Sequence, residues 1–303
     1  MGSPDFALPI LEALARQFLV VGVVTQPNRP AGRGRVLTPP PVKILADRLG
    51  LSAIQPPRLR EGWVMDQLVH WQPELIVVAA FGQILKSGVL NLPPKGCINV
   101  HASLLPRWRG AAPIPAAILQ GDQHTGITIM CMDPGVDTGP ILTQREILID
   151  PEDTTLSLTG KLARLGANLL VETLAGYLSG EIPPLPQDEA LATYAPMLKK
   201  EDSQLDFTQP AEILVRFTRA YTPWPGASTT WRGQRLIILK AHTAFDEQQL
   251  SPGTGRILNN LPAIQTGQGL LVLDEVHPAG KKAMTGRAFL AGAKEWEGGI
   301  LPG

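Results

Sequence analysis

The sequence predicts an α/β protein in two parts, an open and mostly parallel sheet followed by a small β-barrel. Over the first 180 residues, apolar runs of strand length alternate with segments of helical periodicity, the order from which parallel sheets with crossover helices are built. Residues 181–199 contain four prolines and no sustained period, which is typical of an extended linker. Short apolar runs separated by Gly and Pro follow, as in small barrels.

The expected strands of the first part are nearly continuous in Val, Ile and Ala, which favours strands that are covered on both faces. They are residues 19–25, 74–82, 96–102 and 125–132. Helical spacing is found at 42–49, 62–71, 111–120 and 155–178. Right-handed crossovers between such elements give an open sheet of the Rossmann-like type.

The opening residues GSPDF are typical of a turn from a strand into a helix, with Ser3 as helix cap and Pro4 in the first helical position. Only Met1 precedes this turn, although the first strand of such a sheet is central. We therefore expect the first strand to be missing from this sequence. The protein is expected to begin about ten residues upstream, with a short Val- and Ile-rich strand that fills the central position beside the segments ending near Thr25 and Ala80.

The chain is expected to divide into an N-terminal domain over 1–180, a linker over 181–202 and a C-terminal domain over 203–303. The C-terminal domain starts with a helical pattern at 211–220. The strands expected after it, which form an OB-like barrel, are residues 227–232, 234–241, 253–258, 261–266 and 269–276.

The composition is that of a globular protein that can fill real cores, with 303 residues of which 44% are hydrophobic. The 27 basic and 27 acidic residues cancel, so overall charge favours no class of partner. Cys97 and Cys131 lie in apolar runs and are interpreted as buried free thiols of a reducing compartment. Neither a signal peptide nor a membrane span is recognisable, and we expect a cytoplasmic monomer.

Two polar side chains near the end of an expected strand indicate a catalytic site. Asn99 and His101 are two residues apart, so in a strand they point to the same side. Open α/β sheets bind ligands at the carboxyl ends of such strands. Asn supplies a donor for an oxygen that gains charge, and His transfers protons near neutral pH. A histidine that merely caps the strand is the alternative that this run leaves open.

A second loop, MDPGVDTG at 132–139, follows the next expected strand and carries Asp137. An ordinary turn aspartate is the alternative, but a carboxylate beside a histidine orients its ring and favours its protonated form. Asn99, His101 and Asp137 together suit the attack of an amine on a carbonyl carbon. We expect no metal, since no third ligand has suitable spacing, and no dinucleotide, since no G-x-G-x-x-G opens a helix.

Two basic clusters raise the possibility of a nucleic-acid partner. The segment TQPNRPAGRGRVLTPPPVK at 25–43 carries Arg29, Arg33 and Arg35 and has no acidic residue. Lys281 and Lys282 form a second cluster within the expected barrel. Arginine forks match phosphates, although a solvated surface loop explains each cluster equally well when it is taken alone.

The motifs GSPDFA, TQPNRPAGRG, NVHASLLPRWRGAAPI, MDPGVDTG and PAGKKAM, in this order over essentially the whole chain, closely resemble the methionyl-tRNA formyltransferase family. The resemblance implies transfer of a formyl group from 10-formyltetrahydrofolate to the amino group of methionyl initiator tRNA, as the formylation step of translation initiation. It makes 1–180 the catalytic domain and 203–303 a tRNA-binding domain. The missing first strand is where this sequence departs from the family.

The resemblance also assigns the residues. Asn99, His101 and Asp137 become the catalytic trio: the first two stabilise the oxyanion, and Asp137 orients His101 and helps to remove the proton of the amine. The implied folate-binding residues are Ser103, Leu104, Leu105, Pro106, Leu85 and Gly82, and the implied tRNA-binding residues are Arg29, Arg33, Arg35, Lys281 and Lys282. Arg107 and Arg109 fix the loop or the tRNA end, and the sequence does not say which.

Two other functions are weighed against this one. A folate-dependent formyltransferase that acts on an amino sugar nucleotide would carry the same trio, but the two basic clusters favour tRNA. A noncatalytic RNA-binding protein on the same scaffold would not need all three catalytic residues.

Overall fold

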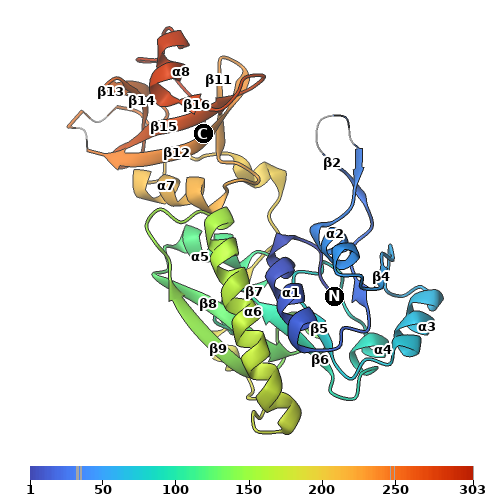
Figure 1. Cartoon of the computed structure of the whole chain (residues 1–303). Helices are drawn as coiled ribbons and strands as arrows, with labels where there is room; N and C mark the ends of the chain where they lie inside the picture. Colours follow the sequence, from blue (N-terminus) through green and yellow to red (C-terminus); the bar gives the residue numbers. More distant parts are fainter. Residues whose placement is uncertain (32–33, 35, 246, 249, 303) are drawn as a thin grey trace. The chain divides into compact units, whose positions relative to one another are not determined.

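The computed structural model describes residues 1–31, 34, 36–245, 247–248 and 250–302 (Figure 1). The chain forms two compact units, each described here by itself. Unit 1 consists of Met1–Pro113, His124–Leu148 and Thr159–Ala195, and unit 2 of Ile114–Gln123, Ile149–Leu158 and Pro196–Gly303. The expected linker is divided between them, with 181–195 in unit 1 and 196–202 in unit 2. No helix in the described part of the chain combines the length and apolar character that crossing a membrane requires.

The sheet of unit 1 begins with parallel strands. β1 (Val23–Val24) pairs with β4 (Ala53–Ile54), and β5 (Ile76–Val78) with β6 (Cys97–His101). Two antiparallel strands, β8 (His124–Cys131) and β9 (Ile141–Leu148), continue the sheet beyond β6. The α/β class is confirmed. The antiparallel edge is the difference, and β9 follows β8 directly because a short turn suffices to join antiparallel strands.

The longer helices agree closely with the sequence-based predictions, whereas the four-residue helix at Ser87–Leu90 is not predicted. They are α1 (Leu8–Gln17), α2 (Pro41–Arg48), α3 (Gly62–Trp71), α4 (Ser87–Leu90), α5 (Pro113–Gln120) and α6 (Thr155–Ser179). α6 approaches the sheet closely at Gly166, where a Cβ atom would lie 2.9 Å from Cγ1 of Val100. The glycine lets the helix backbone rest directly on β6.

Met1 and Gly2 lie between β1 and β5, in the central position of the sheet. The Met1 amine donates to the Val77 carbonyl at 2.6 Å, and the Ala79 N–H donates to the Met1 carbonyl at 2.9 Å. The Gly2 N–H donates to the Val24 carbonyl at 3.1 Å on the other side. Burial lowers the pKa of the Met1 amine to about 6. The pattern is that of a parallel strand, so the sequence contains the last two residues of the strand expected to be missing.

An apolar groove of about 430 Å³ continues from Met1 along β1 and β5. Its lining includes Ile10, Leu11, Val23, Trp71, Ile76 and Leu174. Such a lining suits a buried strand rich in Val and Ile. The upstream strand stays a prediction, and the groove is the site in which it would pack.

An extension of four to six Val and Ile residues before Met1 should stabilise unit 1. Each Val or Ile side chain that enters the groove contributes about 1.5–3 kcal/mol, so two of them should raise the Tm by about 5 °C or more. The measurement is a thermal melt of the extended and unextended proteins. An extension of Gly and Ser of equal length serves as the control, and equal melting of the two extended proteins would contradict the prediction.

Ser3 does not cap a helix, contrary to the sequence-based prediction. Pro4 is the N-cap of a 3-10 turn over Asp5–Ala7 that leads into α1, and no side chain caps it. The Ser3 hydroxyl oxygen instead accepts from the Gln26 N–H at 3.1 Å. It ties the start of the chain to the segment after β1, a contact over 23 positions that the local motif does not reveal.

The segment of residues 185–195, here called the strap, belongs to the body of unit 1. Leu185 and Ile141 exchange two backbone hydrogen bonds of 2.8 Å. β10 (Tyr194–Ala195) pairs in parallel with β7 (Arg109–Gly110). A sequence full of prolines and without period therefore forms ordered structure through backbone pairing with distant loops.

Unit 2 contains a curled antiparallel sheet with the strand path β11-β12-β15-β14-β13, and β16 pairs with β15. In the described residues β11 and β13 do not pair, so the small barrel that the sequence predicts takes the form of a half-barrel. Its core combines residues from both ends of the unit's sequence, since Leu205 and Phe207 belong to the same apolar cluster as Leu301. The elements are α7 (Ala211–Ala220), β11 (Ser228–Trp231), β12 (Gln234–Ala244), β13 (Gly255–Leu258), β14 (Leu261–Gln265), β15 (Leu270–Pro278), β16 (Met284–Thr285) and α8 (Gly286–Gly292).

Candidate active site

β6 carries Asn99 and His101 to the carboxyl end of the parallel strands. The strand lies between β5 and β8, with Asn99 opposite Val78 on one side and opposite Met130 on the other. The alternation of side chains puts Asn99 and His101 on one face, as the sequence predicts. The His101 side chain is 6% exposed, so its ring is nearly excluded from water.

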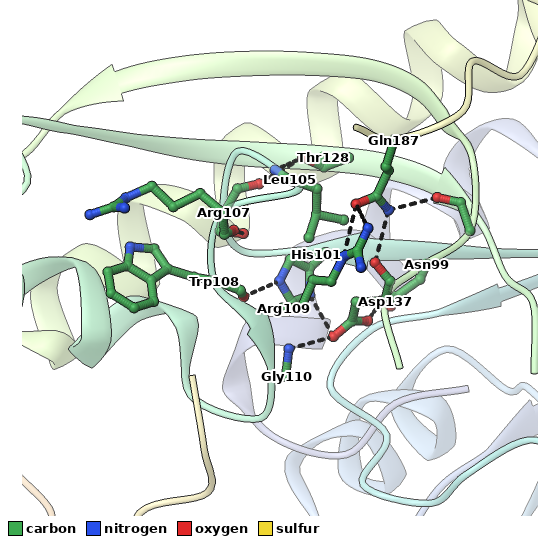
Figure 2. Close-up of polar contacts among 12 residues, drawn as sticks. Asn99, His101, Leu105, Arg107, Trp108, Arg109, Gly110, Thr128, Asp137 and Gln187 are labelled. Carbon is green, nitrogen blue, oxygen red and sulfur yellow. Dashed lines mark hydrogen bonds and ion pairs between the residues drawn. The ribbon is translucent and has the colours of Figure 1, made fainter. Parts of the chain in front are cut away.

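Asp137 joins these two residues from the loop between β8 and β9 (Figure 2). Its Oδ1 accepts from Nδ2 of Asn99 at 3.3 Å, and its Oδ2 accepts from the Gly110 N–H at 2.8 Å. Oδ2 lies 3.6 Å from Nδ1 of His101. The structure thus brings together the three residues that the sequence predicts to be catalytic, from positions 38 apart in the chain.

Both ring nitrogens of His101 face hydrogen-bond acceptors. Nε2 is 3.0 Å from the Trp108 carbonyl oxygen, and Nδ1 faces the Asp137 carboxylate. An N–H on either ring nitrogen therefore points toward an acceptor. The 3.6 Å separation on the Nδ1 side exceeds a hydrogen bond, which leaves that N–H able to donate to a third oxygen.

Asp137 adopts a backbone conformation that a residue with a side chain rarely takes. Its φ is 54°, in the left-handed region, at a cost of about 1–3 kcal/mol. The Gly110 N–H and the Asn99 amide hold its carboxylate in place. A strained aspartate held from both sides is the kind of feature that functional sites contain.

The turn of residues 103–106, predicted to bind folate, is fixed by two side chains from neighbouring strands. Oγ1 of Thr128 accepts from the Leu105 N–H at 3.0 Å and donates to the Ser103 carbonyl at 2.7 Å. Nε2 of Gln144 donates to the Leu105 carbonyl at 2.8 Å. Ser103 is fully buried, and its hydroxyl donates to the Arg107 carbonyl at 2.6 Å. Sequence analysis misses Thr128 and Gln144, because nothing local distinguishes them from other strand residues.

The other predicted folate-binding residues lie in different surroundings. Leu85 is buried in the apolar core with Phe81 and Val89. Gly82 follows Phe81 and has a φ of 77°, and Nε2 of Gln26 donates to the Phe81 carbonyl beside it at 3.0 Å. Leu104 and Pro106 are half-buried in the turn after β6. Their role in folate binding stays a prediction.

Arg109 fixes the loop, which answers one question that the sequence leaves open. Its side chain is fully buried, and it forms a two-bond fork with Glu189 of the strap at 2.7 and 2.8 Å. The hydrogen bond to Glu189 raises the pKa of the guanidinium and lowers that of the carboxyl. Arg107 instead lies over the ring of Trp108, at 4.4 Å from its centroid.

Three of the predicted tRNA-binding residues, Arg29, Lys281 and Lys282, lie on surface segments. β2 (Arg29–Ala31) and β3 (Val36–Thr38) form a hairpin where the sequence predicts a loop. Arg29 at its base donates to Oε1 of Gln26 at 2.6 Å. Arg33 and Arg35 lie outside the described residues. Lys281 and Lys282 are exposed in the turn between β15 and β16 of unit 2.

Both cysteines are free thiols in unit 1. Cys97 is buried, as expected, and burial raises the pKa of its thiol to about 12. Cys131 is only half-buried, at the end of β8, with its sulfur 3.8 Å from the hydroxyl of Tyr177. At neutral pH the raised pKa leaves Cys97 with too little thiolate to act as a nucleophile.

Comparison with known proteins matches the chain in two segments. The formyl transferase family matches residues 1–174, and the formyl transferase C-terminal domain matches residues 197–294. A methionyl-tRNA formyltransferase of Chloroflexus aurantiacus is 51% identical and covers 96% of this chain and 95% of its own. One from Bacillus pumilus is 48% identical, with 97% of this chain and 93% of its own covered.

A more distant solved structure has the same fold. The N-formyltransferase from Helicobacter canadensis, solved in complex with folinic acid and dTDP-3-aminofucose, matches with a TM-score of 0.65 over 90% of this chain and 97% of that one, at 16% identity. Sequence identity near one half over nearly the whole length is decisive, since the sheet, the trio and the C-terminal half-barrel all lie inside the matched region. The chain therefore belongs to the formyl transferase family, among the methionyl-tRNA formyltransferases.

Proposed function

We propose that this chain transfers the formyl group of 10-formyltetrahydrofolate to the amino group of methionine on initiator tRNA. The observation that carries the proposal is the convergence of Asn99, His101 and Asp137 at one end of β6. All three come from one chain, so a monomer suffices for the chemistry. An initiator-tRNA substrate favours the cytoplasm, where translation begins.

Asn99 and His101 supply the donors for the transition state. When the amine nitrogen attacks the formyl carbon, the C–N bond forms and an electron pair moves onto the formyl oxygen. The free N–H of the Asn99 amide and Nδ1–H of His101 then donate to this oxygen. Donors that are already in place as the charge develops typically contribute a factor of about 10²–10³ in rate each.

Asp137 carries the proton-transfer part of the reaction. Its carboxylate is held by Gly110 and Asn99 and lies at 16% exposure, close enough to water for a proton to leave through it. The proton that the amine loses passes to this carboxylate, directly or through a water. Collapse of the intermediate breaks the bond from the formyl carbon to the folate nitrogen, which takes up a proton in turn.

The turn of residues 103–106 and the backbone at Gly82 and Leu85 are proposed to hold the folate. The fixed turn supports this role, because a ligand site needs backbone groups that do not move when the ligand binds. Arg29 on the hairpin, together with Arg33 and Arg35, is proposed to meet the acceptor end of the tRNA, and Lys281 and Lys282 are proposed to meet another phosphate of the tRNA.

Formyl transfer from the folate donor to charged initiator tRNA tests the proposal. Purified protein should produce formylmethionyl-tRNA, detected by acid-gel electrophoresis or mass spectrometry of the released amino acid. A dTDP-linked amino sugar in place of the tRNA tests the alternative that the chain formylates an amino sugar nucleotide. The Helicobacter canadensis protein, solved with such a compound, has the same fold. Transfer to the sugar alone would overturn the tRNA assignment, and transfer to neither would leave only a binding protein.

Replacing Arg29 with Ala should weaken tRNA binding and leave folate binding nearly unchanged. A phosphate contact acts through counterion release, so the slope of log K against log salt should become shallower by about one. The measurement is tRNA affinity from 50 to 300 mM salt. Arg145→Ala, which removes an exposed ion pair with Glu172 elsewhere in unit 1, is the control. An unchanged slope would mean that Arg29 makes no phosphate contact and that the hairpin is an ordinary surface segment.

A further inference from the structure

Gln187 of the strap lies between Arg109 and the loop that carries Asp137 (Figure 2). Its Oε1 accepts from Nε of Arg109 at 3.1 Å and from an Nη of the same guanidinium at 2.9 Å. Its Nε2 donates to the Asp137 carbonyl at 2.8 Å and to the Gly139 carbonyl at 2.7 Å. All four bonds agree with one orientation of the amide, and a flipped amide would lose every one of them.

Arg109 cannot shift independently of the strap. The buried guanidinium uses four N–H bonds, two to Gln187 and two to Glu189. Its own N–H donates to the Thr193 carbonyl at 2.8 Å, and the Trp108 N–H before it donates to Oγ1 of Thr193 at 2.9 Å. The strap therefore holds the carbonyl of Trp108, which contacts the His101 ring, through the residue next to it.

These contacts form a closed circuit around the catalytic groups. Gln187 binds the backbone of Asp137, the Asp137 carboxylate accepts from the Gly110 N–H, and Gly110 follows Arg109, which binds Gln187. The circuit restrains Asp137, whose backbone has left-handed geometry. Without Gln187, the carbonyls of Asp137 and Gly139 lose the donors that fix the turn.

We propose that Gln187 is a positioning residue for formyl transfer, with Arg109 as its support. It acts by holding the loop that carries Asp137 in position relative to Asn99 and His101. This role rests on the proposed function, because Gln187 acts on the reaction through Asp137. A displacement of about 1 Å at a reacting group is enough for a hundredfold loss in rate.

Gln187→Glu is the most informative variant. A carboxylate at this position still accepts from Arg109, as an ion pair, but it has no N–H for the carbonyls of Asp137 and Gly139. Packing and the Arg109 contact are kept while the hold on the loop is lost. We expect kcat to fall about ten- to a hundredfold in Gln187→Glu and in Gln187→Ala, with the KM for each substrate within about threefold. A role in stability alone predicts a Gln187→Glu enzyme with normal kcat.

Combination with Asp137→Ala tests the route of the effect. If Gln187 acts through Asp137, adding Gln187→Ala to Asp137→Ala should cost no further activity. Multiplying losses would overturn the proposal, as would wild-type kcat in Gln187→Glu. Arg145→Ala serves as the surface control and should keep full kcat.

Hydrogen exchange of the backbone amides at 136–139 gives a readout that needs no substrate. Exchange should become faster in both Gln187 variants while the melting temperature of Gln187→Glu stays close to that of the wild type. Unchanged exchange contradicts the positioning role whether or not the protein formylates tRNA. Absence of transfer by the wild-type protein, with faster exchange in the variants, would contradict the proposed function alone.

Discussion

His101→Ala is expected to reduce kcat/KM for formyl transfer by a factor of about 10²–10⁴. The substitution removes the Nδ1 donor proposed for the formyl oxygen and leaves the Asp137 carboxylate without the ring that it faces at 3.6 Å. Folding and tRNA affinity should change little, because the ring lies at the carboxyl end of β6 and is not part of the described apolar core clusters. Single-turnover kinetics with saturating folate donor and tRNA separates the chemical step from binding.

His70→Ala is the matched control for this experiment. His70 is exposed in the last turn of α3, so its loss should leave the rate unaltered. Activity of His101→Ala within a few-fold of the wild-type protein would remove His101 from the catalytic trio.

Trp296→Ala is expected to destabilise unit 2 by about 3–5 kcal/mol. The side chain is 1% exposed, and its ring packs on Trp231 and Phe289 with centroids 4.9 and 5.4 Å away. Its Nε1 donates to the Arg256 carbonyl at 2.9 Å, which the substitution leaves without this partner. For a unit of this size the Tm of its unfolding transition should fall by about 10 °C or more.

Calorimetry of the full chain measures this effect, with Trp224→Ala as the comparison. Trp224 is 54% exposed in the same unit, and its removal should cost less than about 1 kcal/mol. Equal losses in the two variants would mean that Trp296 is not central to the core.

The sequence predicts the helices of unit 1 well, because their periodicity is local. The pattern at 62–71 ends at the same residues as α3, and the pattern at 211–220 matches α7 of unit 2. Short strands are harder to predict from the sequence. β1 contains only two of the seven residues expected for it, because Phe18 to Gly22 come before the residues that pair with Met1–Gly2. β9 alternates only in part and follows a turn rich in Gly and Pro, which hides it.

The trio is predictable from sequence because Asn99 and His101 lie in an apolar strand and Asp137 lies in the loop after the next one. Gln187 and the partners of Arg109 are not, since these contacts span 48 to 80 positions and depend on the strap returning to the site. A glutamine in a proline-rich stretch carries no local sign of its partners. Family resemblance helps with motifs of contiguous residues, and the strap is outside each of those that carry the resemblance here.

The pairing of the strap with the catalytic loop has a consequence for how the protein is made. Gln187 leaves the ribosome 50 residues after Asp137, a delay of about 3–10 s at ordinary rates of synthesis. During this interval the strand, the histidine and the aspartate exist without the amide that holds them together. A fragment that ends at residue 180, where the periodic sequence stops, would remain at that stage permanently. The shortest chain that contains both the trio and the whole strap therefore extends to Ala195, where β10 ends.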